Sequence, residues 1–337
     1  MVDIACPRQE PYWDKFDRLV NGKLVEIPER RFTLRAAWRL VRHVKSHDVS
    51  MIHSHGKGAG VYARFVRLCT GVPVVHTPHG IHYEKYSGLG RKLYLAYERC
   101  TGLLCNAVIF VSDSERTRAE KMSIWPRVPQ WTVYNGVRSR PEEGVYEWRQ
   151  AVRRERSVPS DAPVVVTLAR FDYQKNIEEL VELAARMPDV RFWCLGDGPG
   201  RGEIQSSCRT RGIENLWFAG FVPDPVCYLA AADIYVSTSR GEGMPLSLLE
   251  AMAIGRPAVA TDVTGNCDAV EHGETGWLYP QGQLETAVEW IRRLVDARDQ
   301  RERMGANARA RQRQLFSLET MAEGTRKVYL AVSGASA

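Results

Sequence analysis

The sequence predicts an α/β protein built from two doubly wound, Rossmann-like domains that face one another across a cleft. Short β-branched runs alternate with amphipathic helical patterns, this alternation occurs twice, and 337 residues suit two domains of ordinary size. The apolar fraction of 44% and the charged fraction of 26% are ordinary for globular chains. This composition excludes disordered and fibrous classes.

Runs of β-branched and aromatic residues mark the expected strands, and apolar residues at helical spacing mark the helices between them. In the first half the expected strands are Val2–Ala5, Leu24–Ile27, Ser50–His53, Pro73–Thr77, Ala107–Ser112 and Thr132–Tyr134. In the second half they are Val164–Leu168, Arg191–Leu195, Leu216–Phe218, Ile234–Ser237, Ala258–Thr261 and Gly276–Leu278. Helices are expected at Leu34–Lys45, Gly60–Cys69, Ile177–Arg186, Leu284–Val295, Arg301–Arg313 and Leu318–Val332.

A polar, proline-containing stretch at 138–161 separates the two blocks and indicates an interdomain connection. We predict a first domain over 1–140 and a second over 141–315, with a last helix at 316–332 that packs back on the first. Ligands of parallel α/β sheets bind at the carboxyl ends of the strands. The site is therefore expected in the cleft between the domains.

The N-terminus has no basic region followed by an apolar stretch, and no apolar run reaches the roughly 20 residues of a membrane span. We therefore expect a cytoplasmic protein that is not exported. The eight cysteines form no CxxC pair and are expected to be reduced core residues.

Charge is divided unevenly along the chain. Residues 1–150 contain 24 Lys and Arg against 15 Asp and Glu, whereas residues 151–337 contain 22 against 25. A basic first half favours an anionic partner, although arginines scattered over solvated faces would give the same balance. Within 30–45, arginines recur at helical spacing at Arg31, Arg35, Arg39 and Arg42, with Leu34, Trp38 and Val41 nearby. The pattern is compatible both with a sheet-covering helix that keeps its arginines in solvent, which is slightly favoured, and with a helix that lies on an anionic membrane surface.

The most informative segment is 237–257, which follows a strand and opens a helix. Glu242 lies in the loop, and Glu250 lies eight residues further on, two helical turns along and on a similar face. The free amides of Leu246 and Ser247 at the helix N-terminus suit a phosphate. Amides for an anion and two carboxylates for hydroxyls together fit a nucleotide sugar, and the alternative is an ordinary amphipathic helix.

Two further loops follow strands of the same half. Arg170 and Lys175 are five residues apart across a turn and can clamp a diphosphate, unless they are merely solvated loop charges. The Gly-Asp-Gly-Pro turn at 196–199 places Gly196 where a ligand can approach the backbone, but as a lone turn signal it is weak.

Five histidines cluster after two consecutive strands of the first half. A metal site would need carboxylates at other strand ends of the same domain, where only Asp113 is well placed. We therefore favour histidines that donate hydrogen bonds in the cleft, with His79 the best placed. The five are His53, His55, His76, His79 and His82.

Taken in this order, the segments resemble the retaining GT-B glycosyltransferases of family 4. The strongest match is Glu242 to Glu250, which fits the family's E-x7-E pattern. The resemblance covers almost the whole chain, and its other elements are HSHGKGAG (53–60), HTPHG (76–80), FVSDS (110–114), VYNGV (133–137), RFDYQKN (170–176) and GDGP (196–199).

The resemblance implies a role for each candidate residue. Glu250 would accept hydrogen bonds from the ribose, Glu242 would meet the donor sugar, and His79 would lie near the reacting centre. Arg170 and Lys175 would form the diphosphate clamp. The other donor-binding residues would be Gly243, Met244, Leu246, Ser247 and Gly196. Phe221 and Val222 would contact the base of the nucleotide.

The implied reaction transfers a sugar from a nucleoside diphosphate, UDP being favoured, to an acceptor hydroxyl with retention. No metal and no cofactor are expected, because cations and helix amides can neutralise the departing diphosphate. The expected acceptor is a glycan or lipid-linked acceptor of cell-envelope polysaccharide synthesis, and no recognised module predicts nucleic-acid binding.

One departure from the family concerns the start of the chain. Family members open with a strand, a glycine-rich loop and a helix before the segment that resembles Val2–Pro7, and here this first unit is expected to be absent. Its loss would leave the edges of neighbouring strands unpaired. The alternative to an active enzyme is therefore a catalytically impaired nucleotide-sugar-binding paralogue or a truncated product.

Overall fold

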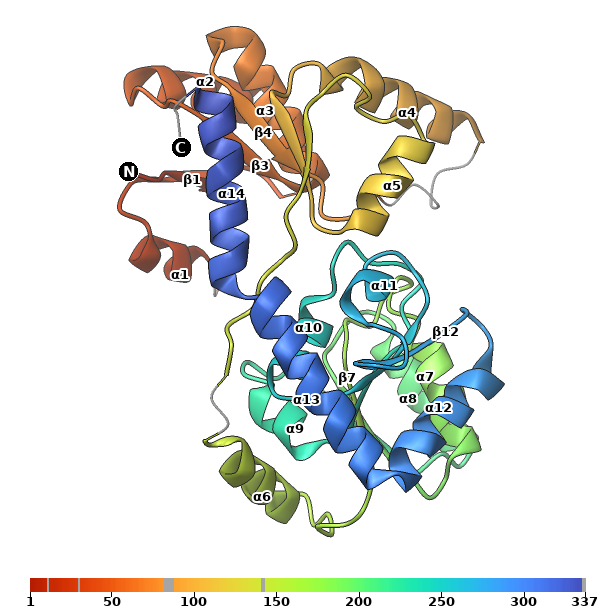
Figure 1. Ribbon diagram of the computed structural model, residues 1–337. Helices are drawn as coiled ribbons and strands as arrows, with labels where there is room; N and C mark the ends of the chain where they lie inside the picture. The colour runs from red at the N-terminus through yellow and green to blue at the C-terminus, as the bar shows by residue number, and fades with distance from the viewer. Residues whose placement is uncertain (11, 30, 82–87, 141–142, 335–337) are drawn as a thin grey trace. The chain divides into compact units, whose positions relative to one another are not determined.

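Parallel strands form the core of both halves of the chain (Figure 1). The computed structural model describes residues 1–10, 12–29, 31–81, 88–140 and 143–334. They divide into two units, the first made of Met1–Phe110, Arg116–Thr132 and Thr325–Ala337, and the second of Val111–Glu115 and Val133–Gly324. The sequence predicted domains at 1–140 and 141–315, with a last helix at 316–332 that packs back on the first domain. These limits stay a prediction.

The first unit contains a four-stranded parallel sheet and a separate pair of parallel strands. The sheet has the order β3-β4-β5-β6, and the pair is β1-β2. The strands are β1 (Ile4–Cys6), β2 (Leu24–Glu26), β3 (Ile52–His55), β4 (Val74–Thr77), β5 (Ala107–Phe110) and β6 (Gln130–Thr132). The helices between them are α1 (Tyr12–Leu19), α2 (Leu34–Ser46), α3 (Gly56–Thr70), α4 (Gly88–Gly102) and α5 (Asp113–Lys121), the last of which begins in residues that belong to the second unit.

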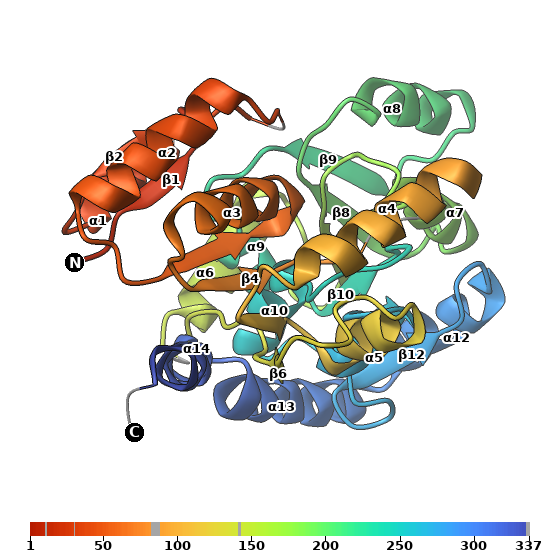
Figure 2. The ribbon, with the colours of Figure 1, turned by 90° about the horizontal axis from the view of Figure 1, so that it is seen from above.

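The β1-β2 pair is joined to the rest of its unit by helix packing rather than by strand pairing. Buried Ala37 and Val41 of α2 pack with Tyr62 and Val66 of α3 in one apolar cluster. The pair lies with α1 and α2 at one end of the unit (Figure 2). Within the described chain, the outer edges of β1 and β3 have no strand partner. The absence of a first strand–loop–helix unit stays a prediction.

The second unit is a doubly wound α/β domain. Its six strands are all parallel and follow the order β12-β11-β10-β7-β8-β9. The order reverses between β7 and β10, and such switch points are where ligands of open α/β sheets bind. The strands are β7 (Val164–Leu168), β8 (Arg191–Leu195), β9 (Leu216–Gly220), β10 (Ile234–Ser237), β11 (Ala258–Thr261) and β12 (Gly276–Tyr279).

Helices of the second unit cover both faces of its sheet. A typical one, α12, buries a stripe of Ala287, Ile291 and Leu294, which is the spacing of one helical face. The helices are α6 (Val145–Glu155), α7 (Ile177–Arg186), α8 (Arg201–Thr210), α9 (Val226–Ala231), α10 (Leu246–Ala253), α11 (Asn266–Ala269), α12 (Leu284–Asp296) and α13 (Arg298–Leu315). The last helix, α14 (Leu318–Ser333), runs from the second unit into the first.

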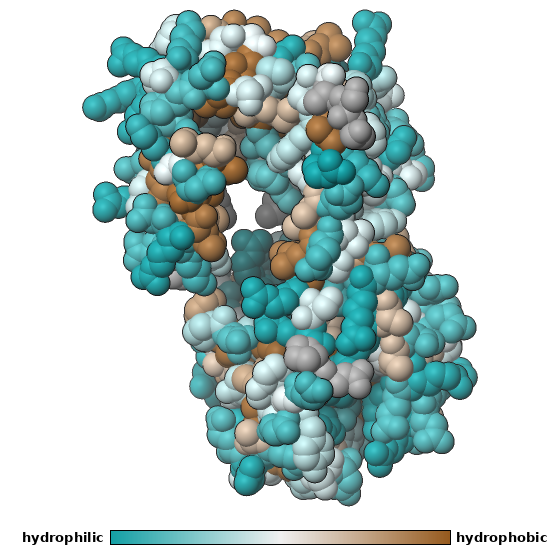
Figure 3. All heavy atoms as spheres, turned by 60° about the vertical axis from the view of Figure 1, so that its left-hand side comes forward, coloured by the Kyte–Doolittle hydropathy of each residue, from teal (hydrophilic) through white to brown (hydrophobic). Residues whose placement is uncertain are grey.

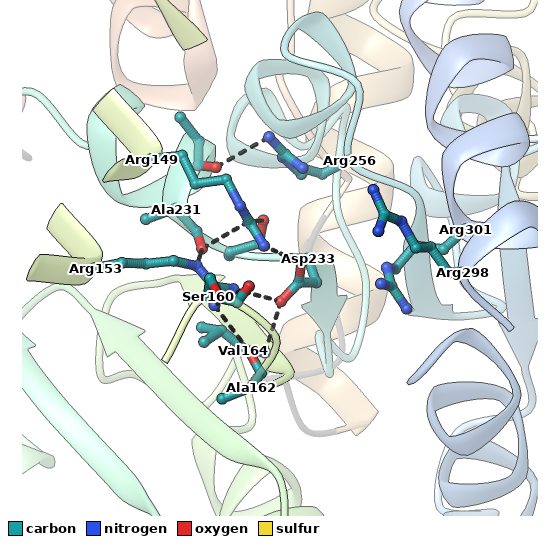
Figure 4. A network of polar contacts seen from close by, with 12 residues as sticks. Arg149, Arg153, Ser160, Ala162, Val164, Ala231, Asp233, Arg256, Arg298 and Arg301 are labelled. Atoms are coloured by element: carbon teal, nitrogen blue, oxygen red, sulfur yellow. Dashed lines mark hydrogen bonds and ion pairs between the residues drawn. The ribbon is translucent and has the colours of Figure 1, made fainter. Parts of the chain in front are cut away.

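A charged network fixes α6 to the second unit (Figure 4). Asp233, which precedes β10, accepts hydrogen bonds from Arg149 and Arg153 of α6 at 2.7 Å each and from the amide of Val164 at 2.9 Å. Arg153 also donates to the carbonyl of Ala231. These bonds compensate the burial of charge at the amino ends of β7 and β10.

Polar residues cover most of the face drawn in Figure 3, and hydrophobic residues show there as separate patches. All eight cysteines are free. In the part of the chain that the structure describes, no helix has the length and apolar character needed to cross a bilayer.

Candidate active site

The loop after β7 holds Lys175 in a defined position. The Asp172 carboxylate accepts hydrogen bonds from the amides of Gln174 (3.0 Å) and Lys175 (3.2 Å), an Asx-turn arrangement. The Thr238 hydroxyl donates to the carbonyl of Lys175 at 3.0 Å. Asn176 closes the loop with φ at 51°, a left-handed conformation that asparagine tolerates well. The backbone on both sides of Lys175 is thereby fixed.

Lys175 and Glu242 meet at the switch point of the sheet. Lys175 Nζ lies 2.6 Å from Glu242 Oε1, and the Ser239 hydroxyl donates to the same oxygen at 2.6 Å. Lys175 follows β7 and Glu242 follows β10, the two strands between which the order reverses. Their side chains are only 18% and 12% exposed. A mostly buried cation and carboxylate thus stand where a ligand is expected.

The loop before α10 is held by its backbone. The Glu242 amide donates to the Thr264 carbonyl at 2.9 Å, and the Gly243 carbonyl accepts from Ser112 Oγ at 2.8 Å. Met244 is buried beside them. The chain therefore arrives at α10 in a fixed direction.

Helix α10 begins at Leu246, so the amides of Leu246 and Ser247 have no carbonyl one turn earlier in the helix. The Ser247 hydroxyl is 2.8 Å from the Tyr235 hydroxyl, whereas Leu246 is half exposed. The helix N-terminus supplies amide donors and a partial positive charge four residues after Glu242 in the sequence.

Glu250 is a half-buried carboxyl about one turn into α10. Within the described residues it has no hydrogen-bond or ion-pair partner. Burial raises the pKa of Glu250, and Asp224 adds to the rise while Arg140 opposes it. An unpaired carboxyl in a partly dry position is suited to accept hydrogen bonds from hydroxyl groups of a ligand.

Arg170 is placed differently from Lys175. Its side chain is 70% exposed and pairs with Asp172 at 3.0 Å. Lys175 and Glu242 are therefore brought into contact, while Arg170 stays on the exposed side of the same loop. A clamp by Arg170 stays a prediction.

Gly196 and the residues after β9 occupy the same carboxyl edge. Gly196 has φ at 135°, and a Cβ atom there would lie 1.9 Å from the Ala169 carbonyl oxygen. Only glycine fits where these two loops approach. Phe221 is 70% exposed and Val222 is half buried, directly after β9. The predicted contact of Phe221 and Val222 with the nucleotide base stays a prediction.

In the first unit, His79 follows β4 in a left-handed conformation, with φ at 54°. Its Nε2 lies 2.9 Å from Nδ1 of His55. His53 bonds the hydroxyls of Tyr329 (2.6 Å) and Thr77 (2.8 Å), and buried His76 bonds Ser54. His82, the fifth histidine of the cluster, lies outside the described residues.

Among the residues that the structure describes, no three His, Cys, Asp or Glu side chains are grouped as a metal site would require. Metal independence and the absence of a cofactor stay predictions.

Some residues of the site carry no obvious sequence signal and were not predicted. Ser239 and Asp172 precede the residues they hold by three positions, so the spacings S-x-x-E and D-x-x-K are a usable signal in retrospect. The contacts of Gln174 with the loop at Gly241 are long-range, and no local pattern announces them.

The six-stranded unit with its switch-point site and the parallel first unit define a two-domain α/β protein of the GT-B glycosyltransferase type. Residues 149–311 match the family model described as Glycosyl transferases group 1, and residues 2–140 match the model described as Glycosyltransferase Family 4. The chain is therefore a glycosyltransferase whose two halves these models describe. This confirms the expected class and fold, whereas retention of configuration stays a proposal.

Named relatives and solved structures agree with this class. The chain is 26% identical to alpha-D-kanosaminyltransferase of Streptomyces kanamyceticus, covering 88% of this chain and 80% of the relative. It is 23% identical to UDP-Gal:alpha-D-GlcNAc-diphosphoundecaprenol alpha-1,3-galactosyltransferase of Escherichia coli, with the same coverage. The fold is similar to that of Anabaena HepE in complex with UDP and glucose, with a TM-score of 0.85 at 19% identity, covering 98% of this chain and 91% of the other.

Proposed function

We propose that this protein transfers a sugar from a UDP-sugar to an acceptor hydroxyl with retention of the anomeric configuration. The single observation that carries the proposal is the Lys175–Glu242 pair at the switch point, 2.6 Å apart. A cation beside amide donors suits a departing diphosphate, and a carboxylate suits sugar hydroxyls. Glu250, unpaired within the described chain, is the proposed contact to the ribose.

In the proposed reaction the bond between the anomeric carbon and the diphosphate oxygen breaks, and a bond from that carbon to the acceptor oxygen forms on the same face. The diphosphate leaves with the electron pair, and the acceptor proton passes to a departing phosphate oxygen. Lys175 and the α10 amides stabilise the charge that develops on the diphosphate. Arg170, five residues before Lys175 in the same loop, would add a second cation if it leaves Asp172.

Donor and acceptor are inferred from relatives. The Escherichia coli relative is named for UDP-Gal and a diphosphoundecaprenol acceptor, and the HepE structures contain UDP. Further relatives are named for lipopolysaccharide core and teichuronic acid biosynthesis. These names support a UDP-sugar donor and a glycan or lipid-linked acceptor of the cell envelope.

Transfer and hydrolysis across a panel of UDP- and GDP-sugars, with and without EDTA, test the proposal. We expect turnover with at least one UDP-sugar in the presence of chelator, and an NMR spectrum of the product with the donor's anomeric configuration. An inverted product would contradict retention. Saturable UDP binding without turnover on any donor would instead favour the impaired paralogue.

We further propose that α2 meets an anionic membrane surface. Arg35, Trp38, Arg39 and Arg42 line a surface groove of about 620 Å³ together with Pro28, Thr33 and Ala36. Trp38 is 50% exposed. Within the described residues, Arg35 and Arg42 have no hydrogen-bond or ion-pair partner. Free guanidinium groups around an exposed tryptophan suit an interface of anionic headgroups.

Sedimentation with vesicles tests this contact. We expect the protein to sediment with phosphatidylglycerol vesicles and not with phosphatidylcholine vesicles, and the double variant R35Q/R42Q to lose most of the binding. The control is R303Q/R313Q, which removes two exposed arginines of α13. Equal losses in both variants would indicate general charge attraction and contradict a site on α2.

A further inference from the structure

The sheet register of the first unit brings two histidine rings together. His55 ends β3 opposite Thr77 of β4, and His79 follows Thr77 by two residues. The two rings are stacked with centroids 5.1 Å apart, and His55 Nδ1 lies 2.9 Å from His79 Nε2. This separation is a hydrogen bond between ring nitrogens.

Only one proton lies between the two rings. Burial lowers the pKa of His79 to about 4, with repulsion from His55 adding to the effect, and burial also lowers the pKa of His55. Both rings are therefore neutral near pH 7, and a neutral imidazole has one N–H and one acceptor nitrogen. Of the two facing nitrogens, one donates and the other accepts.

The tautomers of the two rings are consequently coupled. If His55 Nδ1 carries the proton of the hydrogen bond, His79 Nε2 accepts it and His79 carries its own proton on Nδ1. If His79 Nε2 carries that proton instead, His55 carries its own proton on Nε2. Neither outer nitrogen, His55 Nε2 nor His79 Nδ1, has a hydrogen-bond partner within the described residues. His53 cannot replace His55, because both of its ring nitrogens already bond Tyr329 and Thr77.

We propose that His55 is a positioning residue, which holds His79 in the tautomer with its proton on Nδ1, so that His79 presents a hydrogen-bond donor to a ligand oxygen. The link to catalysis rests on the proposed function. A ligand oxygen that only accepts hydrogen bonds selects the state with a donor at His79 Nδ1. In that state His55 Nδ1–H donates to His79 Nε2.

Long-range ¹H–¹⁵N NMR of ¹⁵N-histidine-labelled protein at pH 7.5 reads the tautomer directly, with His79→Gln assigning the signals. We expect Nδ1–H for His79 in the wild type and in His55→Asn, whose amide can occupy the position of Nδ1 and donate. In His55→Leu, which has no donor, we expect the proton to move to Nε2. If His55→Leu does not fold, His55→Gln takes its place, because its amide reaches the position of Nε2 instead.

Kinetics provide a second readout. We expect kcat to fall about tenfold or more in His55→Leu, because a wrong tautomer removes the donated proton, and to recover largely in His55→Asn. The control is His47→Asn, an exposed histidine of the same unit. An Nε2–H tautomer of His79 in the wild type, or an unchanged tautomer in His55→Leu, would overturn the proposal. A wild type without turnover would contradict the proposed function and leave the NMR test intact.

Discussion

At the residue scale, Lys175 is a lysine whose surroundings are built to hold it. The Asp172 carboxylate and the Thr238 hydroxyl fix its backbone, and Glu242 engages its ammonium group. A lysine is a compact charge on a flexible stem, so a fixed backbone and one carboxylate decide where that charge stands. This precision is what a developing diphosphate charge requires.

Replacing Lys175 by alanine should lower turnover far more than stability. We expect kcat to fall about 100-fold or more, because a donor aimed at the developing charge is removed. The loss of this mostly buried ion pair should cost about 1–3 kcal/mol, which leaves the protein folded. Rates with a UDP-sugar and thermal unfolding measure both effects, with exposed Lys121→Ala as the control. Near-normal turnover in folded Lys175→Ala would exclude the clamp.

Glu250 shows a conflict between stability and binding. Its pKa is raised by burial, so the ionised form is disfavoured in the folded state. Stability is therefore greatest below the ordinary glutamate pKa and decreases as the pH rises through the raised folded value. At neutral pH the full penalty is present.

Glu250→Gln should therefore stabilise the protein at pH 7, by about 0.5–1 kcal/mol, and the difference should vanish near pH 4. It should weaken UDP binding about tenfold, because the amide accepts hydrogen bonds less strongly than a carboxylate. Denaturant unfolding at the two pH values and calorimetric titration with UDP measure these effects. Exposed Glu289→Gln is the matched control. A less stable Glu250→Gln at pH 7 would mean that the carboxylate has a stabilising partner.

At the element scale, the sequence predicted every strand, but the limits and the contacts depend on neighbours. Expected Ser50–His53 is observed at Ile52–His55, because pairing with Val74–Thr77 decides which residues join the sheet. Local patterns found the loops after β7 and β10 separately. Their contact joins residues 67 apart in sequence, and only the strand order brings them together.

The loop after β8 gives a second case. Its turn signal at Gly196 indicated a site for a ligand, whereas the structure gives the glycine a packing reason against Ala169. We expect Gly196→Ala to destabilise by about 2–3 kcal/mol, because the left-handed backbone and the close carbonyl both oppose a Cβ. Gly202→Ala in α8, with open space around it, should stabilise by about 0.5–1 kcal/mol. Urea denaturation compares the two. Equal free energies of unfolding for the two variants would show that the loops at Gly196 and Ala169 move apart readily to admit a Cβ atom.

At the scale of the whole molecule, chain order and unit membership differ. Residues 111–115 belong to the second unit although they follow β5 of the first, and their Ser114 bonds Asp268. The sequence showed two blocks of alternating strands and helices. It contained no signal that residues 111–115 belong to the second unit, or that β1 and β2 form a separate pair. Such features depend on long-range pairing rather than on local propensity.

Separate cores predict separate responses to a ligand. The apolar clusters of the second unit contain Leu248 and Phe192, and those of the first contain Val41 and Phe110, with no residue in common. The proposed UDP contacts, Lys175, Glu250 and the α10 amides, all lie in the second unit. Binding should therefore stabilise that unit, by about 2.7 kcal/mol at a UDP concentration of 100 Kd.

We expect calorimetry to show two unfolding transitions, of which UDP raises only one. Hydrogen exchange assigns them: UDP should slow exchange in β7 and β10 and leave β4 and β5 unchanged. Glu250→Ala should reduce the UDP shift without moving the other transition, since Glu250 belongs to the second unit. A single transition that UDP shifts as a whole would mean that the two units unfold cooperatively, so that a nucleotide bound on one stabilises both.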